Sequence, residues 1–184
     1  MNSRSGNSLI VIEGGQLETY ILDDKNTWKI GRASKDSDPD IVLKMATVSR
    51  KHGRIENKGG VWFYIDEFGK NGTVYNKKHI SKGKSGRIKP VLLENGDILV
   101  FGGGENEVVN FKTVWATYIS REFIENWRTV DTKGSNTFEV VSSEGMVKLE
   151  QPKKGTVIDK KSGMVIYMGD LTYLVGDIEI KMIE

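Results

Sequence analysis

The sequence contains no cysteine and only two histidines, His52 and His79, among its 184 residues. The lack of cysteine excludes disulfides, thiolate metal sites and a cysteine nucleophile, and two histidines are too few for the usual ligand sets of zinc or non-haem iron. No apolar run approaches the roughly 18 residues that a membrane-spanning helix needs. The opening residues, MNSRSGNSL, lack the apolar stretch of a secretory signal. We therefore expect a cytoplasmic protein with no metal, no cofactor and no membrane span.

Proline is scarce too, with three residues, and no helical period persists over a long window. Instead, short runs of β-branched and aromatic residues recur between turns made of Gly, Asn, Asp and Lys. The candidate strands up to residue 119 are SLIVIEGG, LETYIL, TWKIGR, DIVL, GRIEN, VWFYIDE, TVYN, PVLLENGDILVFG and VVNFKTVWATYI. The best helix candidate is residues 120–127, SREFIENW, with Ser120 as a possible N-cap. The pattern predicts an all-β fold, an antiparallel sandwich or barrel.

The chain after residue 126 resembles a second, smaller β-rich unit. Its candidate strands are NTFEVV, MVKLE, GTVID, MVIYM and LTYLVGDIEIKM. Residues 59–78 can be aligned with residues 144–161, and residues 94–102 with residues 167–177, through a few shared Gly, Thr and Asp. Two interpretations stay open, a degenerate internal repeat and the chance similarity of alternating β sequences.

Positive charge is concentrated in one part of the chain. Residues 49–90 hold eleven lysines and arginines against three acidic residues, although the net charge of the whole chain is only +2. A local positive field indicates an anionic partner. The alternative is a set of solvated lysines that keep exposed strands from pairing with other molecules.

The stretch TVSRKHGRIE, residues 47–56, places Ser49 and His52 three positions apart between cations. This spacing in a loop is not typical of a catalytic serine–histidine pair with a third orienting group, and the sequence has no G-x-S-x-G elbow. The run KGKS at residues 82–85 is no P-loop, because Lys78 stands where that motif needs glycine. We expect no enzyme and no catalytic residue. A phosphoryl group, in contrast, requires an arginine fork and hydroxyl or backbone donors on a rigid turn.

Five segments then occur in a recognisable order: WKIGR, DIVL, VSRKHGRI, FYIDEFGKNGTVYN and LENGDILVFG. Together they resemble the forkhead-associated (FHA) domain, whose usual pattern is G-R, an acidic–hydrophobic turn, S-x-x-H, D-x-x-S-x-N-G-T, V-N and L-x-x-G-D-x-I-x-x-G. The resemblance implies an FHA-type antiparallel sandwich of eleven strands over residues 8–118. Residues 127–184 would then be the small β-rich C-terminal unit.

The resemblance also implies a role for each matching residue. Those expected to bind a phosphopeptide are Arg32 as the phosphate fork, Ser49 as hydroxyl donor, Arg50 as a neighbouring contact, and Asn71 as a contact to the peptide backbone. Those expected to support the site are Gly31 and Gly72 as loop-shaping glycines, His52 as a brace for the Ser49 loop, and Thr73 as a structural residue. Asp97 is also expected to be structural.

One position departs from the family's pattern. The family often has small hydroxyl residues just before N-G-T, where this chain has Gly69 and Lys70. We expect Lys70 to contact the phosphate as a point charge, which is more flexible and more sensitive to salt than an arginine fork.

The resemblance thus implies a non-catalytic phosphothreonine-binding module for signalling or complex assembly. Its partner would be a phosphothreonine-containing protein or peptide, made by a Ser/Thr kinase upstream. Two alternatives stay open: a phospho-independent assembly domain of a secretion or division machinery, and nucleic-acid binding through the basic residues 77–89. The nucleic-acid alternative is less favoured, because the aromatics of the basic stretch, residues 49–90, alternate within predicted strands as core residues do.

Overall fold

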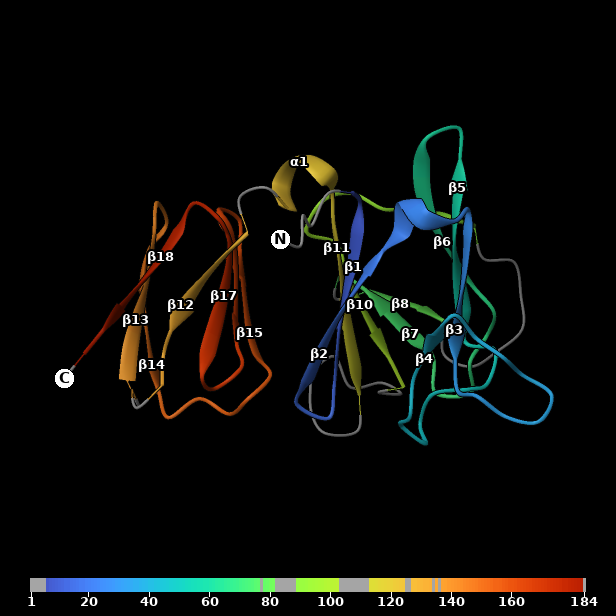
Figure 1. Ribbon diagram of the computed structural model, residues 1–184, viewed down its shortest axis with the longest axis horizontal. Coiled ribbons are helices and arrows are strands. Elements are labelled where there is room, and N and C mark those ends of the chain that lie inside the picture. The colour runs from blue at the N-terminus through green and yellow to red at the C-terminus, as the bar shows by residue number, and fades with distance from the viewer. Residues whose placement is uncertain are drawn as a thin grey trace.

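The computed structural model describes residues 6–76, 78–81, 89–102, 113–124, 127–133, 135 and 137–183. Almost all of the regular structure in this part of the chain is β, arranged as four sheets (Figure 1). The all-β fold predicted from the sequence is confirmed. No helix in the described part is both long enough and apolar enough to cross a membrane.

Strands β1 to β11 form the first two sheets, which we call the N-terminal sandwich. The six-stranded sheet has the order β2-β1-β11-β10-β7-β8, and the five-stranded sheet the order β4-β3-β5-β6-β9. Neighbouring strands run antiparallel except β3 and β4, which are parallel. The strands are β1 (Ser8–Glu13), β2 (Gln16–Ile21), β3 (Thr27–Gly31), β4 (Ile41–Val42), β5 (Gly53–Lys58), β6 (Val61–Asp66), β7 (Thr73–Tyr75), β8 (Lys78–Ser81), β9 (Val91–Leu92), β10 (Ile98–Phe101) and β11 (Val114–Ile119). A 3-10 turn, η1 (Leu22–Asp24), joins β2 to β3.

Strands β12 to β18 form the other two sheets, which we call the C-terminal unit. The four-stranded sheet has the order β12-β17-β16-β15, and the three-stranded sheet the order β14-β13-β18. The strands are β12 (Arg128–Asp131), β13 (Thr137–Ser142), β14 (Gly145–Glu150), β15 (Thr156–Lys160), β16 (Gly163–Tyr167), β17 (Leu171–Gly176) and β18 (Ile178–Met182). The single short helix, α1 (Arg121–Ile124), lies between β11 and β12 in the described part of the chain.

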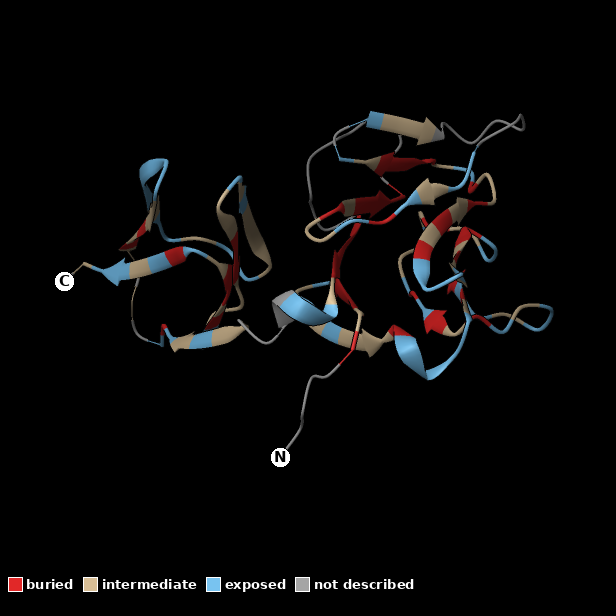
Figure 2. Cartoon of the chain, turned by 90° about the horizontal axis from the view of Figure 1, so that it is seen from above, coloured by how far each residue is buried: buried red, intermediate tan, exposed pale blue. Residues whose placement is uncertain are grey.

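Side-chain alternation along β16 shows how the sheets are layered. Val165 packs into the core between the two sheets of the C-terminal unit. Its neighbours Met164 and Ile166 point the other way and pack against Ile10 and Trp115 of the six-stranded sheet. The four-stranded sheet is therefore buried on both faces, and the four sheets form successive layers (Figure 1). Figure 2 shows buried residues in the strands of both the N-terminal sandwich and the C-terminal unit.

Most predicted strands are confirmed, with a few differences at short or interrupted elements. The predicted strand LTYLVGDIEIKM is two strands, β17 and β18, separated at Asp177, and the short strands β8 and β12 were not predicted. The predicted helix is confirmed for one turn only, and both the N–H and the hydroxyl of Ser120 donate to Asn95 Oδ1. The predicted VVNFK segment falls outside the described residues.

The proposed internal repeat stays a prediction. The alignment matches β6 with β14 and β7 with β15. In both halves the two consecutive strands lie in different sheets. However, β10 pairs with β7, whereas its counterpart β17 pairs with β16 rather than β15. The strand pairing is thus only partly shared.

Candidate functional site

Three loops meet at one end of the N-terminal sandwich: the loop after β3, the loop before β5 and the loop between β6 and β7. The loops are joined by hydrogen bonds: Arg32 N–H donates to the backbone Ser49 O at 3.2 Å, and Lys70 N–H donates to the side-chain Ser49 Oγ at 2.8 Å. The structure therefore brings together Arg32, Ser49 and Lys70, which are far apart in the sequence, and we call this region, with Asn71, the three-loop site. Arg50 follows directly after Ser49 and is exposed.

Arg32 is anchored at one side of its guanidinium group. Its Nε donates to the carbonyl oxygen of Val48, while its two Nη nitrogens make no hydrogen bond or ion pair with any described residue. A guanidinium held at Nε leaves the planar pair of Nη donors free for an anion. The loop that holds Ser49 and Arg50 can pack against residue 31 only because that residue is glycine. A Cβ at position 31 would lie 1.9 Å from Arg50 O.

Ser49 has a hydroxyl proton to give. Its Oγ accepts the Lys70 N–H, and its O–H donates to no described residue, so it is free to donate to a ligand. Because Arg32 bonds to the carbonyl oxygens of Val48 and Ser49, the arginine fork and this hydroxyl belong to one rigid unit.

His52 is fully buried and links the loops. Its Nδ1 accepts the Ser49 N–H at 3.2 Å, so the proton is on Nε2, which faces Gly72 O at 2.9 Å and Thr73 Oγ1 at 3.0 Å. Burial lowers the pKa of His52 below its ordinary value. The imidazole is thus neutral and bonded to the backbone of Ser49, not to its hydroxyl, an arrangement that braces a loop and does not activate a nucleophile.

Asn71 sits in a turn closed by the Gly72 N–H donating to Gly69 O at 2.9 Å. Its Nδ2 donates to Thr47 O at 2.7 Å, which ties this turn to the Ser49 loop. Its Oδ1 makes no hydrogen bond within the described part of the chain and can accept an N–H. Gly72 has a φ of 79°, a left-handed conformation that favours glycine.

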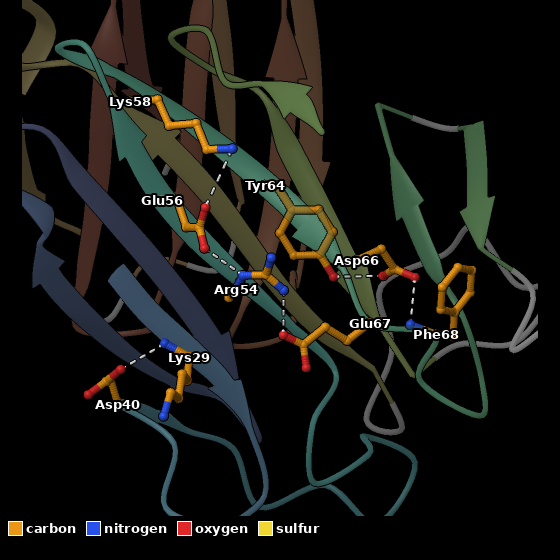
Figure 3. Close-up of polar contacts among 9 residues, drawn as sticks. All are labelled: Lys29, Asp40, Arg54, Glu56, Lys58, Tyr64, Asp66, Glu67 and Phe68. Carbon is orange, nitrogen blue, oxygen red and sulfur yellow. Dashed lines mark hydrogen bonds and ion pairs between the residues drawn. The ribbon is translucent and has the colours of Figure 1, made fainter. Parts of the chain in front are cut away.

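Asp66, at the end of β6, holds the start of β7. Its carboxylate is buried and accepts the Tyr64 hydroxyl at 2.8 Å, the Thr73 hydroxyl at 2.7 Å and the Phe68 N–H at 3.0 Å. Figure 3 shows the bonds to Tyr64 and Phe68. Burial raises the pKa of Tyr64 well above its ordinary value, so this phenol stays a donor. Tyr64 was missed as part of the site because alternation in β6 marks it only as a core residue.

Some of the cations in the basic segment are already paired. Arg54 Nε bonds to Glu56 at 2.6 Å and its Nη1 to Glu67 at 2.8 Å, and Lys58 lies 3.8 Å from Glu56 (Figure 3). The hydrogen bond to Glu56, followed by that to Glu67, raises the pKa of Arg54. These cations are paired with acids on or directly after strands of the same sheet, whereas the exposed side chains of Arg50 and Lys70 make no ion pair with described residues.

The acidic turn before β4 has a structural role. Asp40 accepts the Lys29 N–H at 2.8 Å, shown in Figure 3, and forms an ion pair with Lys25 at 2.6 Å. Burial alone would raise the pKa of Asp40, but the hydrogen bonds from Lys25 and Lys29 outweigh it and lower the pKa. Asp40 thereby ties the end of the segment between β3 and β4, residues 32–40, to β3.

A second polar network lies at the other end of β7. Asp97 accepts the Tyr75 hydroxyl at 2.6 Å, Asn76 Nδ2 at 2.9 Å and the Glu94 N–H at 2.8 Å. All of these partners belong to the protein itself. Of the predicted basic surface over residues 77–89, only residues 78–81 and 89 are described, and residues 77 and 82–88 lie outside the described part.

Comparison with known proteins agrees with this geometry. Residues 28–102 match the family model of the FHA domain. An FHA domain-containing protein of Arabidopsis thaliana is 33% identical over 104 residues, which cover 55% of this chain and 25% of that protein. The glycogen accumulation regulator GarA of Mycolicibacterium smegmatis is 30% identical over 100 residues, which cover 53% of this chain and 56% of GarA. The match thus spans only a quarter and about half of these relatives' own lengths.

Among solved structures, the FhaA FHA domain, determined in a complex, aligns with a TM-score of 0.45 and 23% identity, over 61% of this chain and 99% of that one. Residues 28–102 hold Arg32, Ser49, His52 and Asn71, and thus the whole three-loop site. Residues 28–102 of this chain therefore match the FHA domain, and both relatives align over a comparable length.

Proposed function

We propose that the N-terminal sandwich is an FHA domain, a non-catalytic module that binds phosphothreonine in a peptide or partner protein. The residues that would contact the ligand are Arg32, Ser49, Arg50, Lys70 and Asn71. The observation that carries the proposal is the pairing of two unused donor sets, the Nη fork of Arg32 and the Ser49 hydroxyl, on one hydrogen-bonded loop unit. FHA domains in general are interaction modules of this kind.

Each group has a defined part in the proposed complex. Arg32 gives charge-assisted bonds to the phosphate, each worth about 1.5–3 kcal/mol when made to a charged group. Ser49 donates its hydroxyl proton to a third phosphate oxygen. Asn71 Oδ1, with Nδ2 held by Thr47, accepts a backbone N–H of the peptide next to the phosphothreonine.

Arg50 and Lys70 add positive charge at the edge of the site. They are exposed and unpaired among the described residues, so they would attract an anion without desolvating it. Their contribution is screened by salt, whereas that of the anchored Arg32 is screened less.

The proposal extends to the chain's organisation and setting. We assign residues 8–118 to the phosphopeptide-binding FHA domain and residues 127–184 to the C-terminal unit. The module would act in cytoplasmic signalling or complex assembly, downstream of a Ser/Thr kinase that phosphorylates its partner.

The test is binding of a degenerate phosphothreonine peptide library, with its phosphatase-treated twin as control. Arg32→Ala should lower affinity at least tenfold. Arg121→Ala is the matched control, because it also removes one arginine, far from the site. Its partner Asp23 lies in η1, before the start of β3, whereas Arg32 follows the end of β3. Urea unfolding of each variant shows whether it is folded.

Binding that requires both the phosphate and Arg32 supports the proposal. Equal affinity of wild type and Arg32→Ala would refute the assignment of Arg32. Binding that survives phosphatase treatment and high salt would favour the phospho-independent assembly domain. Binding of DNA or RNA that falls steeply with salt and is unchanged in Arg32→Ala would favour the nucleic-acid alternative.

A further inference from the structure

A cavity of about 980 Å³ lies between the N-terminal sandwich and the C-terminal unit. Val74, Val100 and Trp115 of the six-stranded sheet form one wall, and Met164 and Val175 of the four-stranded sheet form the other. The volume is at the upper end of the range of roughly 300–1,000 Å³ that is typical of ligand sites. None of Arg32, Ser49 or Asn71 lines it, so it is separate from the three-loop site.

One side of the cavity is bounded by a strand with a free edge. Strand β15 pairs with β16 on one side and, among the described strands, with none on the other. Val157 and Asp159, two residues apart on β15, both line the cavity. A peptide that added to this edge as a strand would likewise direct alternate side chains toward the cavity.

Charged residues at the cavity's rim define the ligand further. Lys160 is the last residue of β15 and Lys161 lies in the turn that follows, and neither makes an ion pair with a described residue. On the opposite wall the carboxylate of Asp97 is buried and accepts three hydrogen bonds, and Glu94 is exposed. Asp159 also lines this side, so the two lysines leave the rim beside β15 with a net charge of +1, which is complementary to an acidic side chain.

We propose that the free edge of β15 and this cavity form a second binding site, independent of phosphate. Its ligand is an extended segment of a partner protein, with apolar side chains at alternate positions and an acidic residue beside Lys160 and Lys161. Main-chain hydrogen bonds to β15 would supply affinity, and the cavity and the lysines would supply specificity.

The experiment uses the full chain and synthetic unphosphorylated peptides with alternating apolar residues, made in two series that end in Asp or in Lys. Fluorescence anisotropy gives the affinities. Val157→Trp places a large ring in the cavity, and Val147→Trp is its matched control, because Val147 is a partly exposed valine on another edge strand, β14. Lys160→Glu combined with Lys161→Glu reverses the charge of the rim.

The proposal expects Asp-ended peptides to bind wild type, Val147→Trp and Arg32→Ala with the same affinity. Their affinity for Val157→Trp should be at least tenfold lower. The charge-reversed variant should reverse the preference toward Lys-ended peptides. The proposal fails if no peptide binds wild type more tightly than about 1 mM, if Val157→Trp binds as wild type does, or if binding requires Arg32. A small amphipathic dye that occupies the cavity while no peptide binds would also overturn it.

Discussion

The buried imidazole of His52 should make the protein less stable as the pH falls from 7 toward 5. The folded protein holds His52 neutral, with Nδ1 accepting the Ser49 N–H and Nε2 facing Gly72 O. Burial lowers its pKa below the ordinary value of 6.5. The unfolded chain therefore takes up a proton near pH 6.5 that the folded protein does not bind.

The sign and size of the effect follow from this difference. Below pH 6.5 the unfolded state binds one more proton than the folded state, so the free energy of unfolding falls as the pH falls. The limiting slope is about 1.4 kcal/mol per pH unit, and it continues down to the folded-state pKa of His52. Asp23 and Asp40 do not interfere, because their pKa values are lowered from 3.8 and their stabilisation is lost only at lower pH.

Urea unfolding between pH 5 and pH 7.5 measures the slope directly. In His52→Asn the side-chain oxygen can still accept the Ser49 N–H, yet the slope between pH 5 and 6.5 should largely disappear, whatever the variant's absolute stability. His79→Gln, which alters the only other histidine, should keep the slope. If His52→Asn keeps the slope and His79→Gln loses it, the proton uptake is not at His52. The assignment of His52 as a neutral side chain that braces the loop is then wrong.

Two further substitutions test the packing around the site and between the units. Gly31→Ala should weaken phosphopeptide binding beyond its cost in stability, because its Cβ would lie 1.9 Å from Arg50 O and would push the Arg32 and Ser49 loops apart; peptide titration alongside thermal unfolding checks this, and wild-type affinity would contradict it. Trp115→Ala should cost about 3–5 kcal/mol of stability, since Trp115 is buried against the C-terminal unit; a loss below about 1 kcal/mol in urea unfolding would mean that the two units are not packed in solution.

The strands and the core of the site could be predicted because their signals are local. Alternation in VWFYID places Trp62 and Tyr64 on the buried face, as observed. The order of the motifs selects Arg32, Ser49, His52 and Asn71, and the structure brings them together. Strands β8 and β12 were not predicted, since four-residue segments such as KHIS and RTVD give too little periodicity.

The contacts that hold the site could not be predicted. Arg32 is anchored by the carbonyl of Val48, and Asn71 by the carbonyl of Thr47. Every residue has a carbonyl group, so no residue type marks those two positions. The direction of the Arg32 fork depends on backbone geometry that appears only when the loops are folded.

The sequence of β1 carries a signal for the packing of the C-terminal unit. β1 (SLIVIE) is apolar on successive positions, which is typical of a strand buried on both faces rather than of an outer sheet of a sandwich. In the structure, Leu9 faces the sandwich core and Ile10 faces the C-terminal unit.

The same division of faces joins the site to the layer beneath it. In β7, Thr73 bonds to Asp66 and closes the loop network, while the next residue, Val74, packs in the interface with the C-terminal unit and lines the cavity. One short strand thus carries the turn that presents Asn71 and a wall of the second site. The position of the Asn71 turn therefore depends on packing between the units as well as on the FHA motif.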